Sequence, residues 1–281
     1  MRPSLGRELR LGRISFGTWV GAALCALFVL VALVGPLLLR RPPTLHDLDH
    51  LLEPPSSTHF LGTDESGSDL LTQLCYGARL LLGLASAVVS ICLVFGVVIG
   101  TLAGYFGGWL DEIIMRIIDV LLAFPGILLN IAIAALVPRA GLGVLIFALA
   151  VNGWVGYARV TRAQVLRVRE MEYVLAARAL GVGSWQIMGR HILPNILSPI
   201  LVQATFGAAG VVLVEAGLSF LGLGPPIPYT WGALLSQGTT YYWRARHLLV
   251  VPGVAIGLLV LGCNLLGDGL RDYLDPKSSG K

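Results

Sequence analysis

The side chains best suited to bind a metal ion lie close together in the chain, between residues 46 and 50. His46 and His50 flank Asp47 and Asp49, and two imidazoles with two carboxylates form a donor set that a divalent cation accepts. Metal sites, however, normally draw their ligands from several elements that converge in space, whereas these four residues share one short polar stretch. We therefore interpret the stretch as a polar linker, expect neither a metal nor another cofactor, and keep a cation site as the alternative.

Motifs for catalysis are missing from the sequence. A P-loop needs a lysine after a glycine-rich turn, and the only lysines, Lys277 and Lys281, follow no such turn. The run GLSFLG at 217–222 lacks the spacing of a nucleophile elbow, and the sequence contains no His-Glu-x-x-His motif. The sequence predicts a protein without catalytic residues that does not hydrolyse ATP itself.

The composition indicates a membrane protein. Hydrophobic residues make up 56% of the 281 residues and charged residues only 13%, whereas soluble domains carry about 25% charged residues. Apolar runs of roughly 20 residues cross a bilayer as helices, because a helix satisfies its own backbone hydrogen bonds in lipid. We predict an all-α fold with six transmembrane helices, at approximately 17–39, 79–106, 113–137, 142–160, 194–215 and 248–268.

These spans divide the chain into segments on alternating sides of the membrane. The divisions are an N-terminal tail (1–16), the first helix (17–39), an outer segment (40–78), a five-helix unit (79–270) that contains a long loop (161–193), and a C-terminal tail (271–281). Four arginines precede the first span, six lie at 159–190 in the long loop and just before it, and three basic residues lie in the tail, against five on the opposite side. The positive-inside rule then places both termini in the cytoplasm. We attribute the net charge of +4 to this topology and to anionic lipid rather than to nucleic acid.

Acidic residues next to apolar runs need partners or water. Glu215 ends an apolar run, which makes it a candidate for a translocation path or a gate by default. Another group lies at the start of the third span and comprises Asp111, Glu112, Arg116 and Asp119. Spacings of four and three residues allow Arg116 to pair with both neighbours along one helix face. We interpret this group as a neutralised cluster at a helix end.

Glycines recur every four residues in the second span, at Gly96, Gly100, Gly104 and Gly108. Such a stripe allows the backbone of another helix to approach closely. We expect the partner to be a helix of the same chain rather than another subunit.

A polar insert, EYVLAARALGVGSWQIMGRHILPN, occupies residues 172–195 between apolar segments. Its first half carries a modest apolar stripe, formed by Tyr173, Val174, Ala177 and Leu180. Gly181 and Gly183 permit a break, and a second helical stretch leads to Pro194, which can open the next span. A short helix, a turn and a return to the membrane suit a docking element. The alternative is an amphipathic helix that lies on the lipid surface.

Several blocks of the sequence resemble the permease subunits of ATP-binding-cassette (ABC) importers, specifically the C-type subunit of the dipeptide, oligopeptide and nickel branch. The insert resembles the "EAA" loop of that family, although Leu175 replaces the first residue of the triplet and Glu172 carries the acidic group. Pro125 matches an expected kink, and Ser68 stands where the family has arginine. The further blocks are LGTDESGSDLLTQLCYGAR (61–79), WLDEIIMRIIDVLLAFP (109–125), VEAGLSFLGLGPPIPYTWGALL (214–235) and NLLGDGLRDYLDP (264–276).

The resemblance implies a role and a set of partners for the insert, which we call the coupling segment (172–195). In the family this segment docks on a cytoplasmic ATPase, and the matching residues here are Glu172, Tyr173, Ala176, Ala177, Arg178, Gly181, His191 and Pro194. The implied partners are a homologous permease subunit that completes a heterodimer, two ABC ATPase subunits, an extracytoplasmic solute-binding protein and the lipid of a bacterial inner membrane. The implied solutes are dipeptides or oligopeptides.

Other interpretations remain open. The same architecture could import nickel or another small solute. A secondary transporter or channel would need no ATPase, but it would favour paired intramembrane charges or inverted repeats, and we find only Glu215 near a span end and no convincing repeat. An exporter permease could share the topology, although the EAA-type loop argues against it.

Overall fold

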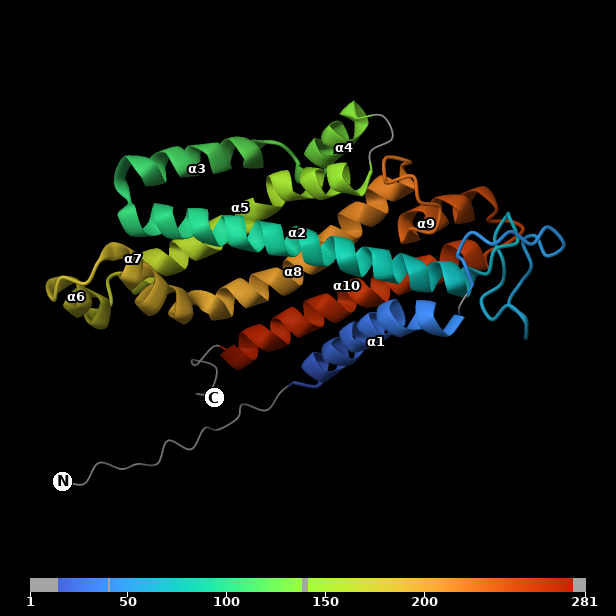
Figure 1. Ribbon diagram of the computed structural model, residues 1–281, viewed down its shortest axis with the longest axis horizontal. Coiled ribbons are helices and arrows are strands. Elements are labelled where there is room, and N and C mark those ends of the chain that lie inside the picture. The colour runs from blue at the N-terminus through green and yellow to red at the C-terminus, as the bar shows by residue number, and fades with distance from the viewer. Residues whose placement is uncertain (1–14, 40, 138–140, 275–281) are drawn as a thin grey trace, which may run out of the picture.

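The computed structural model describes residues 15–39, 41–137 and 141–274, and these residues form a bundle of helices (Figure 1). The all-α prediction is confirmed. The elements are α1 (Phe16–Leu39), α2 (Leu70–Phe106), α3 (Gly108–Ala123), α4 (Gly126–Leu136), α5 (Leu142–Val168), α6 (Glu172–Ala179), α7 (Ser184–Ile187), a π-helical stretch (Met188–Ile192), α8 (Leu193–Phe220), α9 (Trp231–Thr240) and α10 (His247–Leu274).

Five helical segments are long and apolar enough to cross a membrane, and α3 with α4 makes a sixth if the bent pair counts as one span. The predicted span 113–137 is divided into two helices, because α3 and α4 meet at an angle of 81°. The kink expected at Pro125 is present, but it ends one helix and starts another. A proline disfavours helical backbone at the residue before it, and Phe124 accordingly has extended backbone angles, φ −92° and ψ 133°.

The helix ends differ from the predicted spans in places. Helix α2 begins at Leu70, nine residues before the expected start, because the side chain of Asp69 caps it by accepting hydrogen bonds from Thr72 N (2.9 Å) and Thr72 Oγ1 (2.7 Å). Helix α5 continues to Val168 and therefore includes the first residues of the predicted loop 161–193. The predicted tails 1–16 and 271–281 lie mostly outside the described residues.

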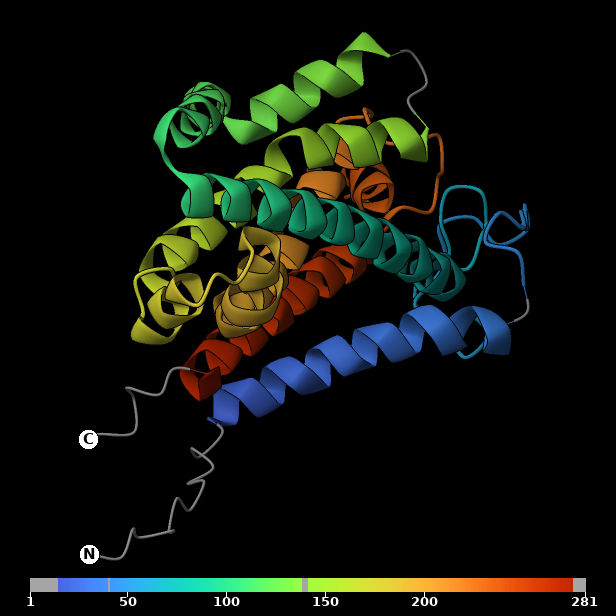
Figure 2. The same cartoon turned by 60° about the vertical axis from the view of Figure 1, so that its left-hand side comes forward.

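The two ends of the bundle have different structures (Figures 1 and 2). The coupling segment, with α6 and α7, lies at one end, while the connection 41–69 and α9 lie at the other. Helices α1 and α10 run antiparallel and touch at Gly21, where an added Cβ would come within 2.9 Å of the Gly262 carbonyl oxygen. The described chain therefore starts and ends toward the end that holds the coupling segment.

The glycine stripe forms the contact between α2 and α5. A Cβ added at Gly96 would lie 2.5 Å from Tyr157 Cβ, and one at Gly104 would lie 2.9 Å from Val165 Cβ. At Gly100 it would collide with the Ala158 carbonyl oxygen. The expected packing within the chain is confirmed for these three positions. Gly108 takes no part, because α2 ends at Phe106 and Gly108 faces open space.

We predict that Gly100→Ala lowers stability whereas Gly83→Ala, in the same helix, does not. The added methyl at 100 meets backbone, while position 83 faces open space, and overpacking costs about 1–3 kcal/mol. The check is the midpoint of thermal unfolding in detergent, followed by size-exclusion chromatography. Equal midpoints for the two variants would contradict this account of the stripe.

Candidate functional site

The coupling segment is anchored to the bundle through one face of α6. Val174 and Ala177 are buried and belong to an apolar cluster with residues at the ends of α5 and α8, among them Val165 and Ile196. The predicted apolar stripe is therefore divided. One face of this two-turn helix packs against the bundle, and the other face is exposed to solvent. Ala177, expected to contact a partner, instead supports the segment from inside, whereas Ala176 is exposed.

The turn after α6 requires glycine at one position. Gly181 has φ +77°, and its N–H donates to the Arg178 carbonyl (3.0 Å) while Val182 N donates to the Ala177 carbonyl (3.1 Å). This pair of bonds is a Schellman motif, which closes a helix with a left-handed residue. Gly183 has φ −60° and faces open space. Of the two predicted break points, only Gly181 is needed for its conformation.

The return to the membrane runs through a π-helical stretch. Leu193 N donates to the Met188 carbonyl as this stretch ends, and Pro194 lies in the first turn of α8 as predicted. The side chain of Asn195 donates to the His191 carbonyl at 2.7 Å. His191 is half-buried, and its backbone carbonyl contributes to the helix entry through this bond.

The last turn of α2 holds the coupling segment from the side. Arg169, which follows α5, donates from Nη1 to the Gly104 carbonyl at 2.7 Å, and a cation at a helix C-terminus is also favoured by the helix dipole. The guanidinium of Arg178 lies over the Tyr105 ring, 5.6 Å from its centroid, in a cation–π contact.

Aromatic packing extends the same contact to α7. Trp185 packs against Phe106 with ring centroids 6.2 Å apart. Tyr105, Phe106 and Arg169 were not among the site residues predicted from the sequence. The available signal was position, because Tyr105 and Phe106 directly follow Gly104 of the stripe and Arg169 lies three residues before the first residue of the insert.

Large apolar side chains remain exposed on the outside of the segment. Leu180 is 84% exposed and Trp185 is 73% exposed, and Tyr173 and Leu175 are also accessible. We call these four residues the outer face. Apolar groups gathered at a polar end of a protein indicate an interaction site. Glu172 and Arg178 add exposed charges beside them.

The predicted charge cluster at the start of α3 has a different partner from the expected one. Asp111 accepts two hydrogen bonds from Arg162 of α5, from Nε at 2.5 Å and from Nη2 at 2.6 Å. The ion pairs found within the described residues include none formed by Glu112, Arg116 or Asp119. All three are exposed, and solvated pairs gain little from a fixed geometry. The cluster therefore ties α3 to α5 through Asp111 alone.

Glu215 is buried where α8 ends. It is 2% exposed and accepts a hydrogen bond from Ser219 Oγ at 2.7 Å. Ser219 lies against Gly224 and Gly232, so the carboxyl group stands beneath the turn that joins α8 to α9. This Gly-Pro-rich run is not helical, as expected, but α9 follows it. A role for Glu215 in gating stays a prediction.

The opposite end of the bundle brings two sequence blocks together. Trp231 Nε1 donates to the Leu74 carbonyl at 3.0 Å and joins the start of α9 to the start of α2. Asp64, almost fully buried, accepts hydrogen bonds from Ser68 N (2.8 Å) and Gln73 Nε2 (2.6 Å). At the position where the family has arginine, Ser68 thus contributes a backbone donor, and Gln73 supplies the neutral side-chain partner.

The stretch at 46–50 forms a local pair. His50 Nδ1 lies 3.0 Å from Asp47 Oδ2, and this hydrogen bond raises the pKa of the exposed His50 imidazole and lowers the pKa of Asp47. Within the described ranges, no three His, Cys, Asp or Glu side chains are grouped so that they could hold a metal ion.

The bundle of long apolar helices defines a polytopic membrane protein, and a polar segment with an exposed apolar face is anchored at one of its ends. The chain belongs to the family of binding-protein-dependent transport system inner membrane components, whose model matches residues 96–280. The resemblance to ABC importer permeases is thereby confirmed.

Curated relatives align over most of the chain. The dipeptide transport system permease protein DppC of Alkalihalophilus pseudofirmus is 42% identical over 259 residues, which cover 92% of this chain and 85% of that protein. The oligopeptide transport system permease protein OppC of Bacillus subtilis is 40% identical, with the same two shares. The glutathione transport system permease protein GsiD of Pectobacterium atrosepticum is 43% identical over 82% of this chain and 77% of its own length.

We predict that Gly181→Ala loosens α6 whereas Gly183→Ala does not. A left-handed residue with a Cβ costs about 1–2 kcal/mol. Of these two glycines, only Gly181 has a positive φ. Hydrogen exchange measured by mass spectrometry should show faster exchange across residues 172–182 in the first variant. Unchanged protection there would contradict the role of the Schellman turn.

Proposed function

We propose that this chain is the permease subunit of an ATP-driven importer of dipeptides or oligopeptides in a bacterial inner membrane. It forms half of a translocation path with a homologous permease subunit, and both termini lie in the cytoplasm. Two separate ATPase subunits bind below, and an extracytoplasmic solute-binding protein delivers the solute from above. No residue of this chain is catalytic in this proposal, because its work is conformational.

The outer face of the coupling segment is the observation that carries the proposal. Leu180 and Trp185 project from an element whose other face is buried against α5 and α8, so a docked partner would push on a supported surface. An amphipathic helix lying on lipid would not need the Schellman turn or the contacts to the end of α2. These contacts favour docking on a protein.

Movement of the docked segment would reach the membrane helices directly. Arg169 and Arg178 contact the last turn of α2, and α2 packs closely on α5 along the glycine stripe. An ATPase that closes against the segment would therefore move α2 and α5 as a pair. This path supports a mechanical coupling between ATP hydrolysis elsewhere and the helices of this chain.

The relatives support a peptide as the solute. Their names specify dipeptide, oligopeptide and di/tripeptide transport. Import of nickel or another small solute would use the same architecture, and a direct comparison of peptide and metal uptake by the assembled complex separates these possibilities.

We predict that Leu180→Glu prevents recruitment of the ATPase subunits. The residue is 84% exposed, so the change leaves the packed cluster intact while it places a charge at the centre of the outer face. Co-purification of the ATPase and solute-stimulated ATP hydrolysis should both fall at least tenfold, a change that corresponds to about 1.4 kcal/mol. The matched control is Trp243→Glu, which is 87% exposed in the connection between α9 and α10 and should leave ATPase co-purification unchanged.

Transport assays in reconstituted vesicles test whether ATP drives peptide uptake. Uptake by the full complex should require ATP on the ATPase side, and vesicles that contain this chain alone should accumulate no peptide. Accumulation driven by an ion gradient in the latter vesicles would establish a secondary transporter instead and would overturn the proposal.

A further inference from the structure

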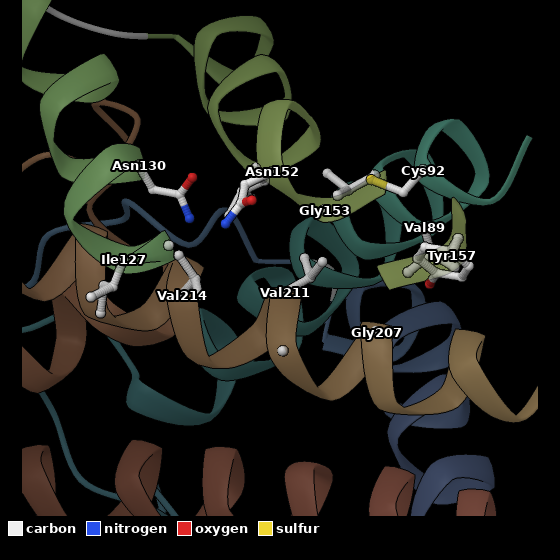
Figure 3. A pocket seen from close by; sticks show the side chains of 14 residues that line it. Val89, Cys92, Ile127, Asn130, Asn152, Gly153, Tyr157, Gly207, Val211 and Val214 are labelled. Carbon is white, nitrogen blue, oxygen red and sulfur yellow. The ribbon is translucent and has the colours of Figure 1, made fainter. Parts of the chain in front are cut away.

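A cavity of about 250 Å³ lies inside this subunit, between α2, α4, α5 and α8 (Figure 3). Val88 and Cys92 line it from the middle of α2, and Val211 and Val214 line it from α8. Fourteen residues form its wall, and none of them is charged.

Three polar groups in this wall lack protein partners. Asn130 is 6% exposed and Tyr157 is 3% exposed, and both line the cavity with Asn152. Among the described residues, Asn130 Oδ1, Asn152 Oδ1 and the Tyr157 hydroxyl form no hydrogen bond. The amides of Asn130 and Asn152 face one another in Figure 3. A buried polar group left unpaired costs about 1–3 kcal/mol, so three of them beside one cavity indicate that a hydrogen-bonding occupant completes them.

Glycines make room for these side chains. A Cβ added at Gly207 would collide with the Tyr157 hydroxyl, and one at Gly126 would lie 2.6 Å from Asn152 Nδ2. Gly126 begins α4 directly after the 81° bend at Pro125. The bend therefore carries α4 and Asn130 over the cavity.

The chemistry of the wall restricts the occupant. A lipid acyl chain would leave the amides and the hydroxyl unpaired, and an ion would find no opposite charge. Side-chain amides provide both a donor and an acceptor, as does a peptide bond. The volume is below the roughly 300–1,000 Å³ of pockets that enclose drug-sized ligands, so it accommodates a short stretch of peptide.

We propose that this cavity is a subsite for the neutral backbone amides of the transported peptide, which Asn130, Asn152 and Tyr157 contact during passage. The inference rests on the proposed function, since it assumes that this chain passes peptides. Uncharged hydrogen bonds to the backbone would accept many side-chain sequences, and they are weak enough for the solute to leave, as conduction requires.

The first test is uptake by the full complex in vesicles, with a tetrapeptide delivered by the solute-binding protein, because its middle amide lies away from the charged termini. Asn130→Leu, Asn152→Leu and Tyr157→Phe should each lower uptake efficiency about three- to tenfold, the equivalent of one hydrogen bond, while ATPase co-purification stays unchanged. Asn264→Leu, in α10 and outside the cavity wall, is the matched control and should transport normally.

The second test leaves the polar residues intact. With Cys25, Cys75 and Cys263 replaced by serine, Cys92 is the only remaining thiol, and it lines the cavity. A saturating tetrapeptide should slow the reaction of Cys92 with a maleimide severalfold in the detergent-purified complex, and added phospholipid should not.

The outcomes separate the two proposals. Normal wild-type peptide uptake, unaffected by the asparagine variants and without peptide protection of Cys92, would mean that the cavity holds only water and would overturn this inference alone. Protection by phospholipid but not by peptide would also overturn it, in favour of a lipid site. An assembled wild-type complex that imports no peptide would overturn the proposed function and this inference together.

Discussion

The close contact between α2 and α5 is the constraint on which the rest of the structure depends. Without a hydrophobic drive between helices in lipid, association relies on close packing, and Gly96, Gly100 and Gly104 bring the α2 backbone directly against α5. This contact runs toward one end of the molecule as far as Gly104. Beyond this contact, the last turn of α2 binds Arg169 through the Gly104 carbonyl.

The same pair of helices connects the two places where we assign function. At the polar end, the residues that follow Gly104 contact Arg178 and Trp185 of the coupling segment. Farther along, Cys92 and Tyr157 of these helices line the cavity. A displacement of the segment by a docked partner would therefore be transmitted along a closely packed pair rather than through a flexible linker. Helix α3 is tied to the pair by Asp111 and Arg162, which links the bent α3–α4 unit, and with it Asn130, to the same body.

Much of this arrangement could be predicted locally. The membrane helices follow from length and apolarity, the end of α6 follows from Gly181, and the entry to α8 follows from Pro194, because each depends on backbone chemistry within a few residues. The internal use of the glycine stripe was also predictable for its first three members. Local rules failed where a distant element competed. Asp111 pairs with Arg162, which is 51 residues away in the sequence. Its exposed neighbours on α3 form no ion pair with one another within the described residues.

The sequence by itself determined that this chain enters a membrane as helices, that it builds no P-loop, and that a polar segment with a glycine turn interrupts its apolar runs. Only the tertiary structure decided which face of that segment is buried, how far α4 turns away from α3, and which polar groups meet around the cavity. The reason is physical. Hydrophobic periodicity and turn chemistry act between residues near in the chain. Burial, the direction of a bend and the placement of Asn130 and Asn152 at one cavity depend on helices that meet only after folding.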